Sequence, residues 1–237
     1  MQCFAISDFH LSMRADKPMD RFGQHWHKHW ERIEESWRAC ITDDDLILLP
    51  GDHSWAMRLE EADLDLGFIQ ALPGHKVLTR GNHDYWWQSI GKIKKAFPGL
   101  HFVQNEAVHF GDVAIGGTRG WLLPPRQGFD DPGEDKIYRR ELERLRLSVS
   151  QLSPRARYRI AMIHYPPLYL NYRDTEFSKI LSEARVDICV YGHVHRNHSQ
   201  KPFQGLHGGV DYHLVSCDML DFKPRHIPWP AEQRATA

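Results

Sequence analysis

The sequence has few cysteines, no long apolar run and almost no net charge, and each shortage excludes a class of protein. No segment approaches the roughly 20 apolar residues of a membrane span, and the first residues lack the basic and apolar regions of a secretion signal. We therefore expect a cytoplasmic protein without membrane contacts. The cysteines lie far apart and form no Cys-x-x-Cys pair, which indicates neither a thiolate zinc module nor a disulfide framework: Cys3, Cys40, Cys189 and Cys217.

The formal net charge of -1 gives the chain no overall attraction to nucleic acid or to an anionic membrane surface. With 237 residues, 41% of them hydrophobic, the chain is long enough to bury a substantial core. It contains no internal repeat, no low-complexity segment and no linker, so we expect one domain over residues 1–237. Nothing in the sequence indicates the oligomeric state.

Strand-like and helix-like segments alternate along the chain, which predicts a layered α/β domain. We expect strands at residues 2–7, 46–50, 75–79, 101–104, 107–117, 158–163, 186–191 and 208–217. We expect helices at residues 24–40, 59–72, 85–97, 134–152 and 177–184. The Asn105-Glu106 pair predicts a turn that joins its flanking strands as an antiparallel hairpin, so at least one sheet should be mixed.

Two groups of polar residues on these helices are expected to face solvent. They are the histidines of helix 24–40, namely His25, His27 and His29, and the acidic residues of helix 59–72, namely Glu60, Glu61, Asp63 and Asp65. The long irregular stretch at residues 117–133 is typical of a lid or a mobile functional segment. The role of its residues 120–133 stays open.

Five strand-like runs end abruptly in side chains that bind metals or transfer protons. In the clearest case the apolar strand 75–79 reaches the turn former Gly81, after which Asn82, His83 and Asp84 project together. Because open α/β sheets bind ligands at the carboxyl ends of their strands, the five ends can converge in space. The other four runs end at Asp8-Phe9-His10, at Gly51-Asp52-His53, at His164 and at Gly192-His193-Val194-His195.

The combined donor set predicts a metal centre. Carboxylates, one amide oxygen and several imidazoles suit divalent Mn, Fe, Zn or Ni, and the set contains no thiolate. It also holds more ligands than one ion needs. Two ions about 3.5 to 4 Å apart can share a carboxylate, activate a water and clamp a phosphate ester, so the set favours phosphoester hydrolysis.

These blocks, in this order, resemble the calcineurin-like metallophosphoesterases. The signature of that family is Asp-x-His, Gly-Asp, Gly-Asn-His followed by Asp or Glu, a lone His, and Gly-His-x-His, and this chain carries every block. The resemblance spans nearly the whole chain and includes an uncharacterised bacterial branch of predicted phosphohydrolases. It implies a four-layer α/β/β/α sandwich of two mixed sheets flanked by helices.

The resemblance also implies roles for the strand-end residues. Two divalent metal ions are expected, with a bridging hydroxide attacking a phosphomonoester or a phosphodiester. The substrate class and the native metals stay open. Asp8, His10 and His195 would hold one ion, Asn82, His164 and His193 the other, and Asp52 would bridge the two.

Three further roles follow from the resemblance. His83 would lie outside the coordination sphere and either protonate the leaving alkoxide or stabilise the charged phosphate. Asp84 would orient the His83 imidazole, and Arg80 would grip the phosphate. His53 departs from the family pattern, and we expect it not to be a ligand because adjacent strand residues face opposite ways. Further candidates for substrate contacts are Arg14, Tyr85, Trp86, Arg119, Tyr165 and the loop around Trp121.

A competing hydrolase interpretation begins at residues 193–198, which nearly spell the His-x-His-x-Asp-His box of metallo-β-lactamase-like enzymes. Asn197 replaces the aspartate of that box. The box also lies too late in the chain for the further ligands which that fold needs, and it leaves the earlier blocks unexplained.

An alternative from another class is a scaffold that keeps the fold without catalysis. In such a scaffold, two carboxylates and several imidazoles would lie unpaired at one sheet edge. This arrangement costs free energy and gives a binding module no advantage. Metal content and phosphoester turnover distinguish the two interpretations.

Overall fold

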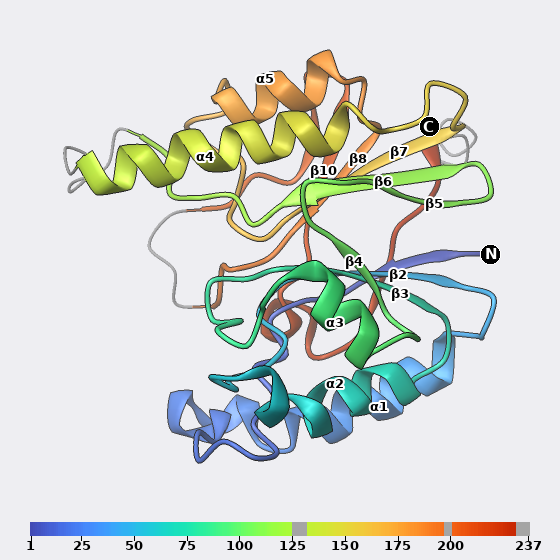
Figure 1. Cartoon of the computed structure of the whole chain (residues 1–237), viewed down its shortest axis with the longest axis vertical. Helices are drawn as coiled ribbons and strands as arrows, with labels where there is room; N and C mark the ends of the chain where they lie inside the picture. The colour runs from blue at the N-terminus through green and yellow to red at the C-terminus, as the bar shows by residue number, and fades with distance from the viewer. Residues whose placement is uncertain (125–131, 197–200, 231–237) are drawn as a thin grey trace.

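The computed structural model describes residues 1–124, 132–196 and 201–230. Two β-sheets pack face to face, and helices cover both outer faces (Figure 1). The predicted α/β/β/α sandwich is therefore confirmed. None of the described helices is long and apolar enough to cross a membrane.

The first sheet has the strand order β11-β1-β2-β3-β4, in which only the edge strand β11 runs antiparallel to its neighbour. Its outer face packs against α1, α2 and α3. The strands are β1 (Cys3–Ala5), β2 (Leu46–Pro50), β3 (His75–Thr79), β4 (His101–Val103) and β11 (Arg225–His226). The helices are α1 (His29–Cys40), α2 (Asp63–Ala71) and α3 (Ile90–Ala96).

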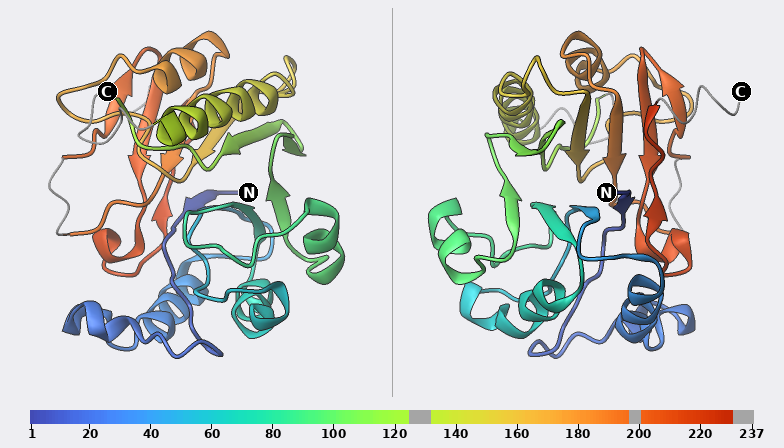
Figure 2. Two further views of the ribbon diagram at one scale, coloured as in Figure 1. Left: turned by 60° about the vertical axis from the view of Figure 1, so that its left-hand side comes forward. Right: turned by 90° about the vertical axis from the view of Figure 1, so that its right-hand side faces the viewer.

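The second sheet has the order β5-β6-β7-β8-β10-β9, with a parallel centre and an antiparallel strand at each edge. Helices α4 (Pro132–Val149) and α5 (Glu176–Glu183) cover its outer face, as Figure 2 shows from two further sides. The strands are β5 (Val108–Phe110), β6 (Val113–Thr118), β7 (Tyr158–Ile163), β8 (Ile188–Tyr191), β9 (Gly205–His207) and β10 (Val210–Leu214).

The central strands are apolar on both faces because each separates two cores. Successive side chains of a strand point to opposite faces. In β2, Leu46 and Leu48 therefore join the core between the sheets, whereas Ile47 and Leu49 join the core beneath the helices. Strands β7 and β8 alternate in the same way. A continuous apolar run is the sequence pattern of a strand covered on both sides.

Three predicted helices begin later than expected. Residues 24–40 divide into a 3-10 helix at Gln24–Trp26 and then α1, because Lys28 takes a left-handed φ of 54°. Residues 59–72 likewise divide into a 3-10 helix at Leu59–Glu61 and then α2. Helix α3 begins only at Ile90, since the indole N–H of Trp86 donates to Asp84 and the preceding residues form turns.

The predicted hairpin around Asn105-Glu106 is wrong. Strand β4 pairs in parallel with β3 in the first sheet, whereas β5 and β6 form their own antiparallel hairpin in the second. Residues 104–107 carry the chain from one sheet to the other. The carbonyl groups of Asn105 and Glu106 accept hydrogen bonds from Gln151 and Ser148, so contacts with the end of α4 replace strand pairing.

Two polar side chains expected in solvent are buried instead. His29 lies 3.0 Å from the Phe9 carbonyl oxygen through Nε2 and 3.2 Å from that of Trp26 through Nδ1. Asp65 accepts hydrogen bonds from the Met13 N–H and from the Ser54 hydroxyl. The sequence shows that both side chains are polar, but it cannot show the hydrogen-bond partners that distant loops supply.

Truncation of the core between the sheets should destabilise the fold strongly. Ile160 is fully buried there, so Ile160→Ala is expected to lower the free energy of unfolding by about 2 to 5 kcal/mol. The matched control is Leu147→Ala on α4, where the side chain is 54% exposed and the change should stay within about 0.5 kcal/mol. Urea denaturation measures both, and equal losses would contradict the layered arrangement.

Candidate metal centre

The strand-end side chains predicted to form a centre lie together where the carboxyl ends of both sheets meet. Two contacts join the sheets at this edge: the backbones of Ser7 and Ser216 form a β-bridge, and the backbone N–H of His193 donates to Asp8 Oδ1 at 3.0 Å. The centre draws on five strands in all. Asp8 and His10 follow β1, Asp52 follows β2, Asn82 and His83 follow β3, His164 follows β7, and His193 and His195 follow β8.

Two groups of potential ligands share the Asp8 carboxylate. Asp8, His10 and His195 have ligand atoms within 4.8 Å of one another, and so do Asp8, Asp52 and His164. Asp52 Oδ2 lies 3.7 Å from His10 Nε2 and 3.4 Å from His164 Nε2. It therefore faces an imidazole of each group.

Asn82 extends the second group. Its Oδ1 atom lies 2.7 Å from His164 Nε2 and 2.9 Å from His193 Nδ1. The amide oxygen and the two imidazoles thus converge on one point. The structure brings together all seven side chains predicted as metal ligands, while their roles as ligands stay a prediction.

Glycine is required in these motifs because the backbone there passes very close to the ligand side chains. A Cβ atom on Gly81 would lie 2.1 Å from Asp52 Oδ1, and one on Gly192 would lie 2.4 Å from Asp8 Oδ2. A Cβ atom on Gly51 would lie 2.5 Å from His164 Nδ1. Each contact is shorter than real Cβ atoms tolerate, so only glycine fits beside the ligand groups.

The backbone at the centre is held in conformations that side-chain-bearing residues rarely adopt. Asp8, His10, Asp52 and His193 have φ values of 60°, 48°, 56° and 70°. Left-handed non-glycine residues of this kind cost free energy and concentrate at functional sites. Here the turn after each strand aims a ligand group toward the same point.

Burial makes the charges of the centre interdependent. Burial raises the pKa of Asp8, and the nearby imidazoles of His164 and His195 offset part of that rise. Burial acts on Asp52 in the same sense, but His164, His10 and His83 hold its pKa below the ordinary value. Burial alone would lower the pKa of His164, yet the Asp52 charge raises it to about 9.

The donor set fits divalent cations. Asp8 and Asp52 are at most 1% exposed, and no lysine or arginine of the described residues pairs with either. The ionisable side chains of the described residues that face them most closely are imidazoles. His10 Nδ1 is also buried without a hydrogen-bond partner in the part of the chain that the structure covers. Oxygen and nitrogen donors of this kind suit Mn, Fe, Zn or Ni.

Two imidazoles of the centre are oriented by hydrogen bonds through their Nδ1 atoms. His164 Nδ1 lies 3.0 Å from the Pro50 carbonyl oxygen, and His195 Nδ1 lies 2.9 Å from Asp218 Oδ1. Donation from Nδ1 leaves Nε2 free to bind a metal. Sequence reasoning missed Asp218, although it follows β10 as the other acids of the centre follow their strands.

The predicted role of Asp84 is wrong. Its carboxylate accepts the N–H groups of Asp52, His53 and Gly81 at 2.9, 2.8 and 2.7 Å, as well as the Trp86 indole N–H. It therefore ties the turn after β2 to the turn after β3 and does not orient His83. The His83 Nδ1 atom has no partner among the described residues.

The remaining candidates lie outside the cluster of ligands. His53 Nε2 donates to the Thr79 carbonyl oxygen at 2.9 Å, and His53 belongs to neither group of potential ligands, in line with the expectation. Arg14 pairs with Asp63, and Arg119 pairs with Glu141. Trp86 is fully buried, whereas Tyr85 is exposed and Tyr165 lies against His193.

Arg80 lines a small cleft beside Arg119, and its Nε atom is buried without a partner in the described structure. Its contact with phosphate stays a prediction.

Two sequence predictions concern segments outside the described residues. They are residues 125–131 of the predicted lid, and Asn197 and His198 of the metallo-β-lactamase-like box.

Comparisons with known proteins add family evidence. The family model described as calcineurin-like phosphoesterase matches residues 1–197. A solved protein of unknown function from Aquifex aeolicus is similar at 14% identity with a TM-score of 0.49, over 100% of this chain and 99% of its own. A second solved chain has 14% identity and a TM-score of 0.56, over 89% of this chain and 88% of its own.

No curated protein matches the chain. The second solved chain supports the fold alone. The family model covers most of the chain, including every motif from Asp8 to His195, and favours this family over the metallo-β-lactamase-like interpretation. The chain belongs to the calcineurin-like phosphoesterase family.

Proposed function

We propose that the protein is a dinuclear metal-dependent phosphoesterase that hydrolyses a phosphomonoester or a phosphodiester. The observation that carries the proposal is the pair of buried carboxylates, Asp8 and Asp52, set among imidazoles from both sheets. Family membership supports phosphoester hydrolysis as the reaction.

The residues divide into two sets that share Asp52. Asp8, His10 and His195 would form one set, and Asn82, His164 and His193 the other; the first cluster and the short distances from Asn82 Oδ1 to His164 and His193 support this division. Two divalent ions bound there would supply the nucleophile, a hydroxide between them, by lowering the pKa of water to about 7, and would neutralise phosphate charge.

The protein's own proton donor would be His83. Its side chain lies beside the ligands without being needed as one, and its Nδ1 atom has no competing partner among the described residues. The ring packs against Trp55, with 4.4 Å between centroids, which fixes its position. As the phosphorus–oxygen bond to the leaving group breaks, the electron pair stays on that oxygen and His83 donates a proton to it.

Asp84 and Arg80 would act in other ways. Asp84 positions the ligand turns through the backbone of Asp52 and Gly81. Arg80 directly follows β3, lines the cleft beside Arg119 and would offer a guanidinium suited to phosphate oxygens.

Removal of the shared carboxylate charge should weaken metal binding and slow turnover strongly. Asp52→Asn is expected to reduce bound metal from two equivalents to one or fewer, and to slow Mn²⁺-dependent hydrolysis of a chromogenic phosphodiester by about a hundredfold or more. Elemental analysis and steady-state kinetics measure these changes, and circular dichroism checks the fold. Asp44→Asn, at an exposed position, is the matched control. Full activity of Asp52→Asn would refute the bridging role.

Loss of the proton donor should depend on the leaving group. His83→Ala is expected to keep its metals but to hydrolyse an alkyl phosphoester about 10² to 10⁴ times more slowly. A p-nitrophenyl ester should lose less, because nitrophenolate leaves without a proton. His27→Ala, at an exposed position outside the ligand set, serves as the control. An equal loss for both esters would argue against proton donation, and no loss would remove His83 from the mechanism.

A further inference from the structure

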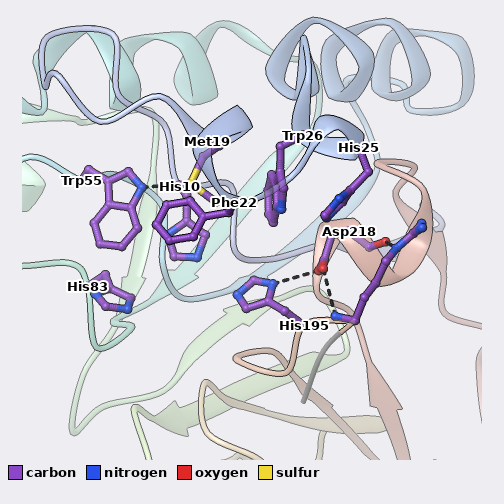
Figure 3. A pocket seen from close by; sticks show the side chains of 10 residues that line it. His10, Met19, Phe22, His25, Trp26, Trp55, His83, His195 and Asp218 are labelled. Atoms are coloured by element: carbon purple, nitrogen blue, oxygen red, sulfur yellow. Dashed lines mark hydrogen bonds and ion pairs between the residues drawn. The ribbon is translucent and has the colours of Figure 1, made fainter. Parts of the chain in front are cut away.

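A pocket of about 240 Å³ opens directly beside the candidate metal centre. Its lining includes three histidines of the centre, His10, His83 and His195, and three aromatic side chains, Phe22, Trp26 and Trp55. Figure 3 shows Trp55, Phe22 and Trp26 along one side, with His83 and His195 facing them. The pocket thus has a reactive side and an aromatic side.

We propose that this pocket binds a planar aromatic ring on the leaving group of the phosphoester. The inference rests on the proposed function and adds a substrate class to it. The ring would belong either to an aryl ester or to the base of a nucleotide, and these two sources share the same flat apolar chemistry.

The position of His83 places the leaving group in this pocket. His83 lines the pocket wall, and it is the group proposed to protonate the departing oxygen. A proton donor must lie within hydrogen-bond reach of the atom that it protonates. The substituent on that oxygen therefore extends into the pocket that His83 borders. Asp8 and Asp52 do not line this pocket.

The chemistry of the walls favours an aromatic occupant. Phe22 and Trp55 lie nearly parallel, at 14° with 6.5 Å between centroids, and Trp26 stands at the other side of Phe22. Phe22 is 55% exposed, so an aromatic face is available at the pocket mouth. Aromatic pairs gain about 0.5 to 1.5 kcal/mol beyond simple burial, which rewards a ring over an alkyl chain.

The polar groups of the pocket require few hydrogen bonds from such an occupant. Asp218 is the acidic residue among the described lining residues, and both of its carboxylate oxygens are engaged, by His195 and by the Arg196 N–H. Lys17 Nζ lies 3.4 Å from the centroid of the Trp55 ring. The volume is also below the roughly 300 to 1,000 Å³ of pockets for drug-sized ligands, so it suits one ring system.

Two of the three aromatic residues of the wall come from residues 11–28, the excursion of the chain between His10 and α1. Two 3-10 helices, Met19–Phe22 and Gln24–Trp26, meet at Gly23, whose φ of 137° only glycine adopts readily. This turn holds Phe22 and Trp26 over the centre. The excursion supplies no predicted metal ligand, so it contributes to selectivity and not to the metal chemistry.

Binding of unreactive ligand pairs tests the proposal. Isothermal titration calorimetry on the full-length Mn²⁺-loaded protein compares phenylphosphonate with methylphosphonate, and the phosphonate analogue of adenosine 5′-monophosphate, in which a methylene group replaces the ester oxygen, with the same analogue of ribose 5-phosphate. Each pair differs by one aromatic ring. We expect the ring to tighten binding by about tenfold or more in at least one pair. A gap in the first pair identifies an aryl ester, and a gap in the second identifies a nucleotide.

Variants of Phe22 locate the effect. Phe22→Ala should reduce the affinity ratio roughly three- to tenfold, and Phe22→Leu should reduce it in part because it keeps apolar bulk without a flat face. Leu147→Ala, at a similarly exposed position on α4, should leave the ratio unchanged. Thermal unfolding checks that each variant is folded.

The possible outcomes are distinct. If the wild-type protein binds methylphosphonate and hydrolyses phosphoesters but neither ring tightens binding, the aromatic subsite is overturned while the proposed function stands. The subsite is also overturned if Phe22→Ala keeps the full ratio and Leu147→Ala behaves alike. If the protein with two metals bound hydrolyses no phosphoester and binds none of the four ligands, both proposals fail.

Discussion

Two carboxylates buried without a lysine or arginine partner among the described residues are the constraint on which this structure depends. Asp8 and Asp52 lie where the two sheets meet, and the ionisable side chains of the described residues that face them most closely are imidazoles. Isolated buried charges are costly, so the arrangement is stable only when positive charge reaches them. The charge of Asp52 accordingly raises the pKa of His164 to about 9. Divalent cations would supply positive charge directly, which explains why so many donors converge.

The surrounding backbone and its hydrogen bonds hold the ligand side chains close together. Glycines occur where a Cβ atom would collide with a ligand group, and left-handed turns aim the side chains. Asp84 ties the turns after β2 and β3 together through backbone N–H groups, and Asp218 orients His195. The metal chemistry is thus built on rigid strand ends. Phe22 and Trp26 of the adjoining pocket come from residues 11–28, which contain no predicted metal ligand, so substitution there would change the pocket wall and no ligand.

The sequence predicted the parts that depend on local pattern or on motif order. Strands β2, β3 and β7 have the expected bounds because their apolar runs are continuous, and the ligand set was recognisable because each member follows a strand. Contacts between distant segments were not predictable. The turn at Asn105 packs on α4 instead of closing a hairpin, and His29 finds the Phe9 carbonyl across a loop. The partners of Asp84 are backbone groups, which no side-chain pattern reveals.

Anomalous diffraction from crystals of the Mn²⁺-loaded protein would test the central claim most directly. The account predicts two manganese peaks about 3.5 to 4 Å apart, with Asp52 between them and with the imidazoles of His10 and His164 on opposite sides. A single peak, or ions bound away from Asp8 and Asp52, would contradict it.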